Sequence, residues 1–130
     1  DTVHMHPAAD GAAIGAASLA DFRTLCGVVA EMGAAQAGGA GGVWLNFGSA
    51  VIMPEVFLKA VSIARNLGHA LDGMHTANFD MLMHYRPTQN VLRRPVAAGC
   101  GHPVSGHHEI LLPLLRQAII EQLPTAARGA

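Results

Sequence analysis

The stretch Gly41–Glu55 constrains the fold of this chain more than any other. It begins as the compact apolar run Val43–Phe47, turns at Gly48–Ala50, and continues in a helical pattern from Pro54. The order strand, tight turn, helix is typical of an open parallel sheet, in which ligands bind beyond the carboxyl ends of the strands. Free backbone N–H groups at such a turn favour an anion or a nucleotide. The alternative is that the turn has only a structural role.

The composition favours a single globular unit. Of the 130 residues, 51% are hydrophobic and 13% are charged, so the chain is too apolar for disorder and long enough for one core. A net charge of −1 disfavours binding to nucleic acid or to an anionic membrane. Cys26 and Cys100 form no CxxC motif and no disulfide framework. With no uninterrupted apolar run of about 18 residues, we expect a cytoplasmic protein.

Two helices are predicted around the central strand. Ser18 is a candidate N-cap, and apolar residues at three- and four-residue steps predict a helix over 18–32, after a loop over 7–17. A second helical pattern covers 54–67, with its apolar side inward, and Gly68 suits the C′ position.

The second half of the chain is less regular. A strand over 73–80 completes a βαβ unit, and Asn78 is expected where that strand changes to a polar loop. The region 81–104 contains three prolines and little periodicity, which predicts a long functional connection or a segment contributed to a neighbouring subunit. A last helix is expected to begin within 105–113 and to run to Leu123.

The apolar residues are few for a sheet that must be covered on both faces. Gly/Ala-rich stretches leave few large apolar side chains, whereas parallel strands need apolar helices packed on both faces of the sheet. We therefore expect residues 1–130 to form one α/β domain that is the carboxyl-terminal part of a larger one. We also expect a homo-oligomer that covers its apolar surface.

Eight histidines suggest metal chemistry as one possibility. His4 and His6, near a possible strand end over 2–5, resemble the HxH ligand pair of metal-dependent hydrolases, since alternate strand residues point the same way. The run His107–Glu109 could supply a further ligand. The chain has no HExxH motif, and neighbouring histidines also occur as ordinary hydrogen-bonding residues at a helix start. A metal-dependent hydrolase is therefore an alternative function.

A second polar cluster follows the predicted strand over 73–80. His84, Tyr85 and Arg86, with the pair 93–94, could clamp a carboxylate or a phosphate through charge-assisted hydrogen bonds. The alternative is a solvated basic loop. The candidate catalytic residues are His84, Arg86 and Glu109.

Four segments in order resemble deoxyhypusine synthases. Ala9–Gly15 resembles their Thr-Asp-Gly-x-x-Gly segment, and Gly42–Val51 resembles their Gly-rich strand and turn. Thr76–Asp80 resembles their Thr-Ala-x-x-x-Asp loop shortened by one residue, and Ile110–Leu115 resembles their final helix. The resemblance covers most of this chain and corresponds to less than the second half of a family member.

The resemblance implies a Rossmann-like, three-layer parallel sheet that binds NAD. It also implies a homotetramer with sites at subunit interfaces, in which NAD oxidises spermidine and an aminobutyl group is transferred. The cofactor-binding residues that it implies are Asp10, Gly11, Gly48, Ser49, Thr76, Ala77, Asp80, His107 and His108.

The chain also departs from the family. The catalytic lysine that forms the imine has no counterpart between Asp80 and Ile110, and Lys59, the only lysine, lies on the polar side of a predicted helix. We therefore expect a divergent family member that binds NAD and acts on a small molecule such as an amine, with transfer of a group as the candidate reaction. A third alternative is a non-catalytic, subunit-forming protein.

Overall fold

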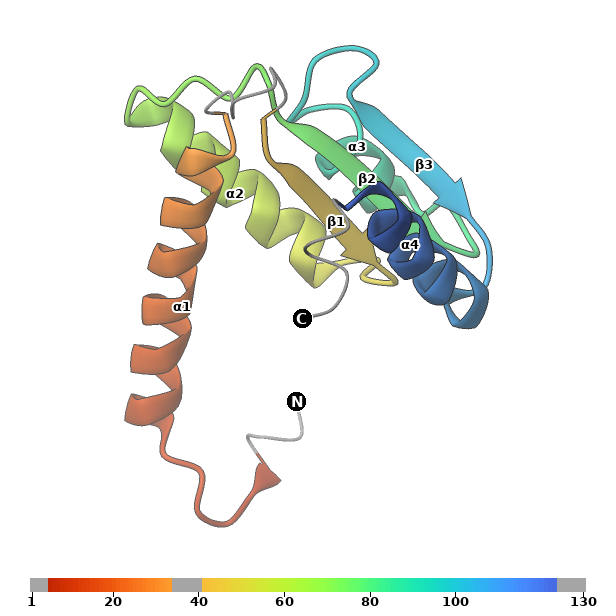
Figure 1. Cartoon of the computed structure of the whole chain (residues 1–130). Coiled ribbons are helices and arrows are strands. Elements are labelled where there is room, and N and C mark those ends of the chain that lie inside the picture. Colours follow the sequence, from red (N-terminus) through yellow and green to blue (C-terminus); the bar gives the residue numbers. More distant parts are fainter. Residues whose placement is uncertain (1–4, 34–40, 124–130) are drawn as a thin grey trace.

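A three-stranded parallel sheet flanked by helices forms the molecule. The structure, a computed structural model, describes residues 5–33 and 41–123 (Figure 1). Each strand pairs with the next along the chain, in the order β1-β2-β3. The α/β class and the predicted βαβ unit are therefore confirmed. The elements are α1 (Gly11–Glu31), β1 (Val43–Phe47), α2 (Ile52–Asn66), β2 (His75–Asp80), α3 (Tyr85–Asn90), β3 (Gly101–Ser105) and α4 (His108–Gln122).

The two faces of the sheet are covered by different helices. Alternate strand residues point to opposite faces. On one face Trp44 stacks on Phe57 of α2, with their ring centroids 4.3 Å apart. On the other, Phe47 and Phe79 stack on each other at 4.4 Å, and α4 crosses this face (Figure 1). Helices thus lie on both sides of the sheet, which agrees with a three-layer arrangement.

α2 supplies the largest part of the core. The side that the sequence predicts to be apolar is buried at Phe57, Ala60, Val61 and Ala64. Leu67, predicted on the same side, is 73% exposed, because it is already the C-cap of the helix. Gly68 takes the predicted C′ position with a φ of +90°, and its N–H donates to the carbonyl of Arg65 while that of His69 donates to Ala64. This pair of bonds is the Schellman motif.

α1 begins earlier than predicted. Asp10 is its N-cap, and the Asp10 carboxylate accepts a 2.9 Å hydrogen bond from the N–H of Ala12. The expected loop over 7–17 and the N-cap at Ser18 are therefore wrong from Gly11 onward. Alanine is the strongest helix former, so the Ala-rich residues after Asp10 continue the helix back to the first good cap.

The corrected length changes how α1 compares with a membrane span. Its 21 residues contain an 18-residue window with a mean hydropathy of 1.4, so α1 is long and apolar enough to cross a membrane by length and composition alone. Asp21 and Arg23 interrupt the apolar residues of α1, so the helix passes this test by its average hydropathy and not by an uninterrupted apolar run. A core helix or a signal sequence passes the same test, so this finding is weak evidence for a span, and α1 packs against α2.

The region 81–104 is not a structureless connection. It contains the short helix α3 and most of β3, which pairs with β2 over its whole length. The sequence did not predict β3, because it contains Pro103 and proline is usually absent from paired strands. In β3 the even-numbered neighbours bond to β2, so Pro103 faces the outer edge, where no N–H is needed.

Smaller differences concern single residues. Asn78 lies inside β2 and is fully buried, so it does not mark the change to a loop. Pro54 is the third residue of α2, not the first, and its missing N–H is still one that the first turn leaves without a helical partner. Met5 lies in a 3₁₀ turn, not at a strand end, and residues 1–4 lie outside the described part of the chain. The last helix begins within the predicted range.

Candidate functional site

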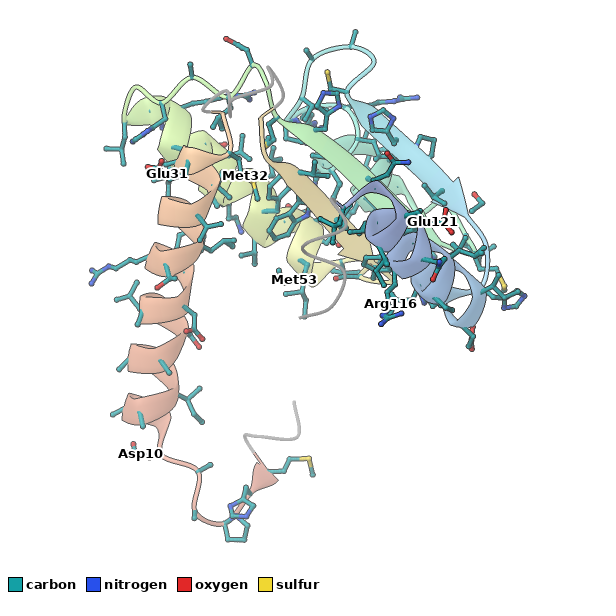
Figure 2. The ribbon with its side chains drawn as sticks, in the orientation of Figure 1. Asp10, Glu31, Met32, Met53, Arg116 and Glu121 are labelled. Carbon is teal, nitrogen blue, oxygen red and sulfur yellow. The ribbon has the colours of Figure 1, made fainter. Side chains whose placement is uncertain are left out.

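The turn between β1 and α2 lies at the carboxyl edge of the sheet. Gly48 has a φ of +63°, and its N–H donates to the carbonyl of Phe79 at 3.1 Å. The Ser49 hydroxyl then accepts a 3.2 Å hydrogen bond from the N–H of Met53 in the first turn of α2. Figure 2 labels Met53 at this end of α2. The turn therefore delivers the chain from the strand end to the amino end of the helix, as the sequence predicts.

His108 of α4 closes against this turn. Its Nε2 atom lies 2.9 Å from the carbonyl oxygen of Phe79, and its ring meets that of Phe47 edge-on at 6.2 Å. A Cβ atom placed on Gly48 would lie only 2.8 Å from Cε1 of His108. Gly48 and His108, two of the predicted cofactor residues, are thus brought together. Their close approach is by itself a structural reason for a glycine at position 48.

A hollow of about 320 Å³ opens beside the turn, lined by Ala50, Val51, His84, Tyr85 and Arg86. Its far wall is the start of α3, whose N-cap is His84. The structure therefore brings two candidate catalytic residues, His84 and Arg86, to the same edge of the sheet as Gly48 and Ser49.

A carboxylate is fixed behind this hollow. Glu55, in the first turn of α2, accepts a 2.8 Å hydrogen bond from Nδ2 of Asn90, and its Oε1 lies 3.4 Å from Nε of Arg86. Asn90 in turn accepts from Nη1 of Arg94 at 3.1 Å. The sequence predicts Arg86 and Arg94 as binding residues for a carboxylate or phosphate, but Glu55 and Asn90 were missed, because no local spacing relates these residues of α2 and α3.

A buried amide pair lies under the turn and was also missed. Nδ2 of Asn46 donates to Oδ1 of Asn78 at 2.6 Å and to the carbonyl of Ser49 at 3.0 Å. The available signal was repetition, since both strands carry Asn-Phe near their carboxyl ends and the two dipeptides pair in register. A polar residue at the same place in two apolar strands indicates a shared hydrogen bond.

Other predicted cofactor residues lie elsewhere. Asp10 and Gly11 begin α1, and Figure 2 shows Asp10 at the end of α1 that is far from the sheet. Thr76 lies near the amino end of β2, fully buried, and its hydroxyl donates to the carbonyl of Val91 at 2.6 Å. Ala77 follows it in the middle of the sheet and is buried too. The side chains of Thr76 and Ala77 are therefore enclosed by the fold and do not reach the carboxyl edge.

The remaining predicted residues end β2 or begin α4. Asp80 is the last residue of β2, and its backbone carbonyl accepts from the N–H of Gly106 at 3.2 Å. His107 is the N-cap of α4 and Glu109 lies in its first turn, both with exposed side chains. These three residues share the carboxyl edge with Gly48, because β2 and β3 run parallel to β1.

The described residues contain no cluster of metal-ligating side chains that would support the metal-dependent alternative. No group of three or more His, Cys, Asp or Glu side chains that could hold a metal ion occurs in residues 5–33 and 41–123. His4 lies outside these residues, and Nδ1 of His6 accepts a hydrogen bond from the N–H of Ala8 at 3.1 Å. His75 and His102 form a pair, with Nδ1 and Nε2 3.2 Å apart.

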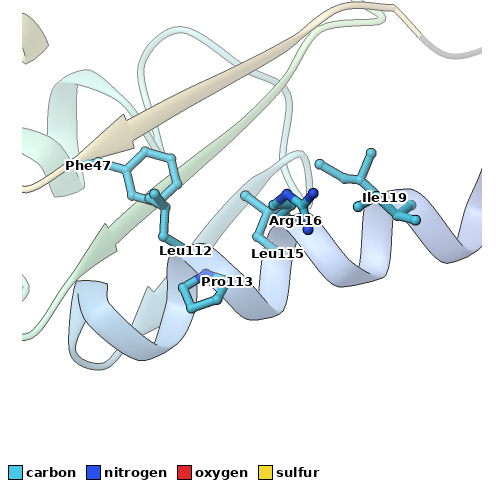
Figure 3. A pocket seen from close by; sticks show the side chains of 7 residues that line it. Phe47, Leu112, Pro113, Leu115, Arg116 and Ile119 are labelled. Atoms are coloured by element: carbon cyan, nitrogen blue, oxygen red, sulfur yellow. The ribbon is translucent and has the colours of Figure 1, made fainter. Parts of the chain in front are cut away.

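A larger hollow lies between Phe47 and α4 (Figure 3). It measures about 580 Å³, and Phe47 together with apolar residues of α4 forms its walls, with Arg116 as the charged side chain. Its lining offers little polar chemistry, so we place the candidate site at the Gly48–Ser49 turn and the His84–Arg86 wall.

Comparisons with known proteins add no relative. No family model, no curated protein and no solved structure matches this chain.

Proposed function

We propose that this chain is a divergent deoxyhypusine synthase-like protein with a Rossmann-like fold, which binds NAD at the carboxyl edge of its sheet. The observation that carries the proposal is the path of the chain from β1 to α2. Gly48 turns with a positive φ, Ser49 caps the first turn of α2, and a hollow with a cationic wall opens beside them. This is where parallel α/β sheets bind nucleotides.

The charges around the hollow suit a phosphate group. The amino end of α2 carries the positive end of the helix dipole. Arg86 is 51% exposed, and apart from the contact between its Nε and Glu55 its guanidinium has no bond to another described residue. Its terminal nitrogens therefore remain to bind an anion in the forked geometry that arginine favours. Glu55 holds Nε of Arg86 in place, although the negative charge of Glu55 disfavours an anion nearby.

We assign binding and positioning roles to the edge residues. His84 and Tyr85 line the hollow with Arg86 and could orient a small-molecule substrate such as an amine. Lys59 is exposed and lines a separate hollow between α1 and α2, with Asp21 and Phe22 of α1. The family's imine chemistry is therefore not part of the proposal.

We further propose that copies of the chain associate in the cytoplasm. α4 has no buried residue, and Leu112, Leu114 and Ile119 on it are about half exposed. A helix that is apolar on several sides requires cover.

Calorimetric titration with NAD tests the site. Arg86→Gln removes the charge but keeps a polar side chain, and we expect NAD affinity to fall about tenfold, which corresponds to about 1.4 kcal/mol. Arg23→Gln, on the exposed side of α1, is the matched control and should leave the affinity unchanged. Absence of NAD binding at millimolar concentration would refute the cofactor, and equal affinities of the two variants would refute this location.

A further inference from the structure

A pair of histidine rings lies at the surface of the β2–β3 ladder. His75 begins β2, and His102 is the second residue of β3, which runs beside β2 (Figure 1). Ala77 is paired with His102, and alternate strand residues point to the same face of a sheet. The side chains of His75 and His102 are therefore neighbours on one face. Thr76, between His75 and Ala77, points to the opposite face and bonds inside the core.

The histidine pair lies apart from the proposed NAD site. His75 is paired with Val43 at the amino ends of β2 and β1, whereas the Gly48–Ser49 turn follows the carboxyl end of β1. His102 is exposed and His75 is half-buried, so solvent and small ions reach both rings. Any ligand of this pair is therefore bound independently of NAD.

The two rings meet through their nitrogen atoms. Nδ1 of His75 lies 3.2 Å from Nε2 of His102. The ring planes are within 9° of parallel, but the ring centroids are 5.6 Å apart, so the closest contact is between the nitrogen-bearing edges. A hydrogen bond at this contact uses one N–H and one lone pair, because a neutral imidazole has one donor and one acceptor nitrogen. A metal ion that replaces this proton would accept a lone pair from each ring.

The separation of the two nitrogen atoms suits a single metal ion. An imidazole nitrogen lies about 2.0–2.1 Å from Zn²⁺, so two such nitrogens at a tetrahedral angle are about 3.3–3.4 Å apart. The observed 3.2 Å separation has to open by only about 0.1–0.2 Å, within the tolerance of a metal site. The rings must also tilt so that both lone pairs converge on the ion, and the exposure of His102 leaves room for this movement.

The ligands define the kind of ion. Imidazole nitrogens favour Cu²⁺, Ni²⁺ and Zn²⁺, whereas Mg²⁺ and Ca²⁺ prefer oxygen ligands. No third His, Cys, Asp or Glu side chain joins the pair within residues 5–33 and 41–123, so water would complete the coordination. Nε2 of His75 and Nδ1 of His102 bond to no other described residue. Because outer hydrogen bonds of this kind strengthen metal sites, their absence here predicts an ion that exchanges with solvent.

We propose that His75 and His102 form a bidentate, exchangeable binding site for a divalent transition-metal ion, with water at the remaining positions. The bound ion would join β2 to β3 near their amino ends, because each strand supplies one ligand. The proposal rests neither on NAD binding nor on the His4 and His6 pair.

Calorimetric titration of the whole chain with Zn²⁺ tests the site. His75→Gln and His102→Gln each remove one ligand, and His69→Gln, at an exposed histidine outside the pair, is the matched control. We expect each pair variant to weaken binding at least about tenfold, and the double variant to bind little more weakly than either, because chelation needs both rings. The control should bind as tightly as the unaltered protein. Unchanged affinity in either pair variant, or an equal loss in His69→Gln, would overturn the proposal.

The imidazole NMR signals of the unaltered protein provide an independent measurement. Of the eight histidines, we expect His75 and His102 to show the first shifts of their ring C–H signals when Zn²⁺ is added below one equivalent. The other six should respond only to excess ion. A first response at other histidines, or no response up to millimolar Zn²⁺, would overturn the proposal. Because this measurement needs no substitution, it decides the question if a variant fails to fold.

Discussion

The side chains of Asn46 and Asn78 are joined across the β1–β2 ladder by a 2.6 Å hydrogen bond in which Nδ2 of Asn46 donates to Oδ1 of Asn78. Asn46 is 3% exposed and Asn78 is fully buried. Because Asn46 also donates to the carbonyl of Ser49, the pair connects the two strand ends to the turn of the candidate site. A buried pair of this kind is costly to disrupt on one side only.

Changes to the amide pair should therefore be strongly non-additive. Asn78→Leu leaves the amide of Asn46 without one of its acceptors, and we expect it to lower the free energy of unfolding by about 1–3 kcal/mol. The combined change Asn46→Leu/Asn78→Leu should cost less than the sum of the two single changes. Urea denaturation measures this, with Asn66→Leu on the exposed side of α2 as the control. Strictly additive effects would show that the two amides act independently.

Gly48 is predicted to be needed for two reasons, the positive φ and the approach of His108. Gly68 has a positive φ of +90° but nothing within 4 Å of an added Cβ atom. Gly68→Ala should therefore cost about 1–2 kcal/mol from backbone strain alone, and Gly48→Ala should cost more. Adding His108→Ala to Gly48→Ala should recover part of the difference.

Thermal unfolding of the unaltered protein, Gly68→Ala, Gly48→Ala and Gly48→Ala/His108→Ala separates backbone strain from the contact with His108. Equal losses at Gly48 and Gly68 would show that the ring of His108 moves aside freely. Since any side chain at Gly48 acts on the fold, loss of NAD binding by a Gly48 variant would not by itself prove contact with the cofactor.

Thr76 should be a structural residue. Its hydroxyl bonds to the carbonyl of Val91 at 2.6 Å inside the core, so Thr76→Val should lower the free energy of unfolding by about 1–3 kcal/mol. Thr76→Ser keeps the hydroxyl and should cost less. NAD affinity, measured below the unfolding temperature, should not change in either protein. If Thr76→Val weakened NAD binding without changing stability, Thr76 would have to be assigned to the cofactor site.

The local patterns of the chain predicted α2, β1 and β2 well. The α2 segment has a clear apolar period and a glycine stop, β1 is an apolar run that ends at Gly48, and β2 begins after Gly73. The choice of the carboxyl edge as the candidate site follows from the order strand, turn, helix. The start of α1 was missed because Ser18 offered a cap as good as Asp10, and only packing and alanine propensity decide between them. β3 was hidden by Pro103, whose outward direction depends on pairing with β2. Glu55, Asn90 and the Asn46–Asn78 pair depend on contacts between distant segments, which no local spacing encodes.

Lys59 should not form an imine with a substrate. It is exposed on α2 beside α1, and imine catalysis requires a lysine that is held against the reacting carbon and partly neutral. We expect incubation with spermidine and NAD, followed by borohydride reduction, to leave no butylamine adduct on the chain. Peptide mass spectrometry checks this, and an adduct mapped to Lys59 would show that this side of α2 faces an active site.

The most direct test of the proposed function is the map of backbone amide shifts during an NAD titration, recorded by NMR on the unaltered protein. If NAD binds at the carboxyl edge, the largest shifts should fall on the turn and first helical residues, 48–53, and on the opposite wall, 84–86. The amides of Asp10 and Thr76 should change little. No shift up to millimolar NAD, or shifts centred on Asp10 and Thr76 with the edge unaffected, would contradict the account.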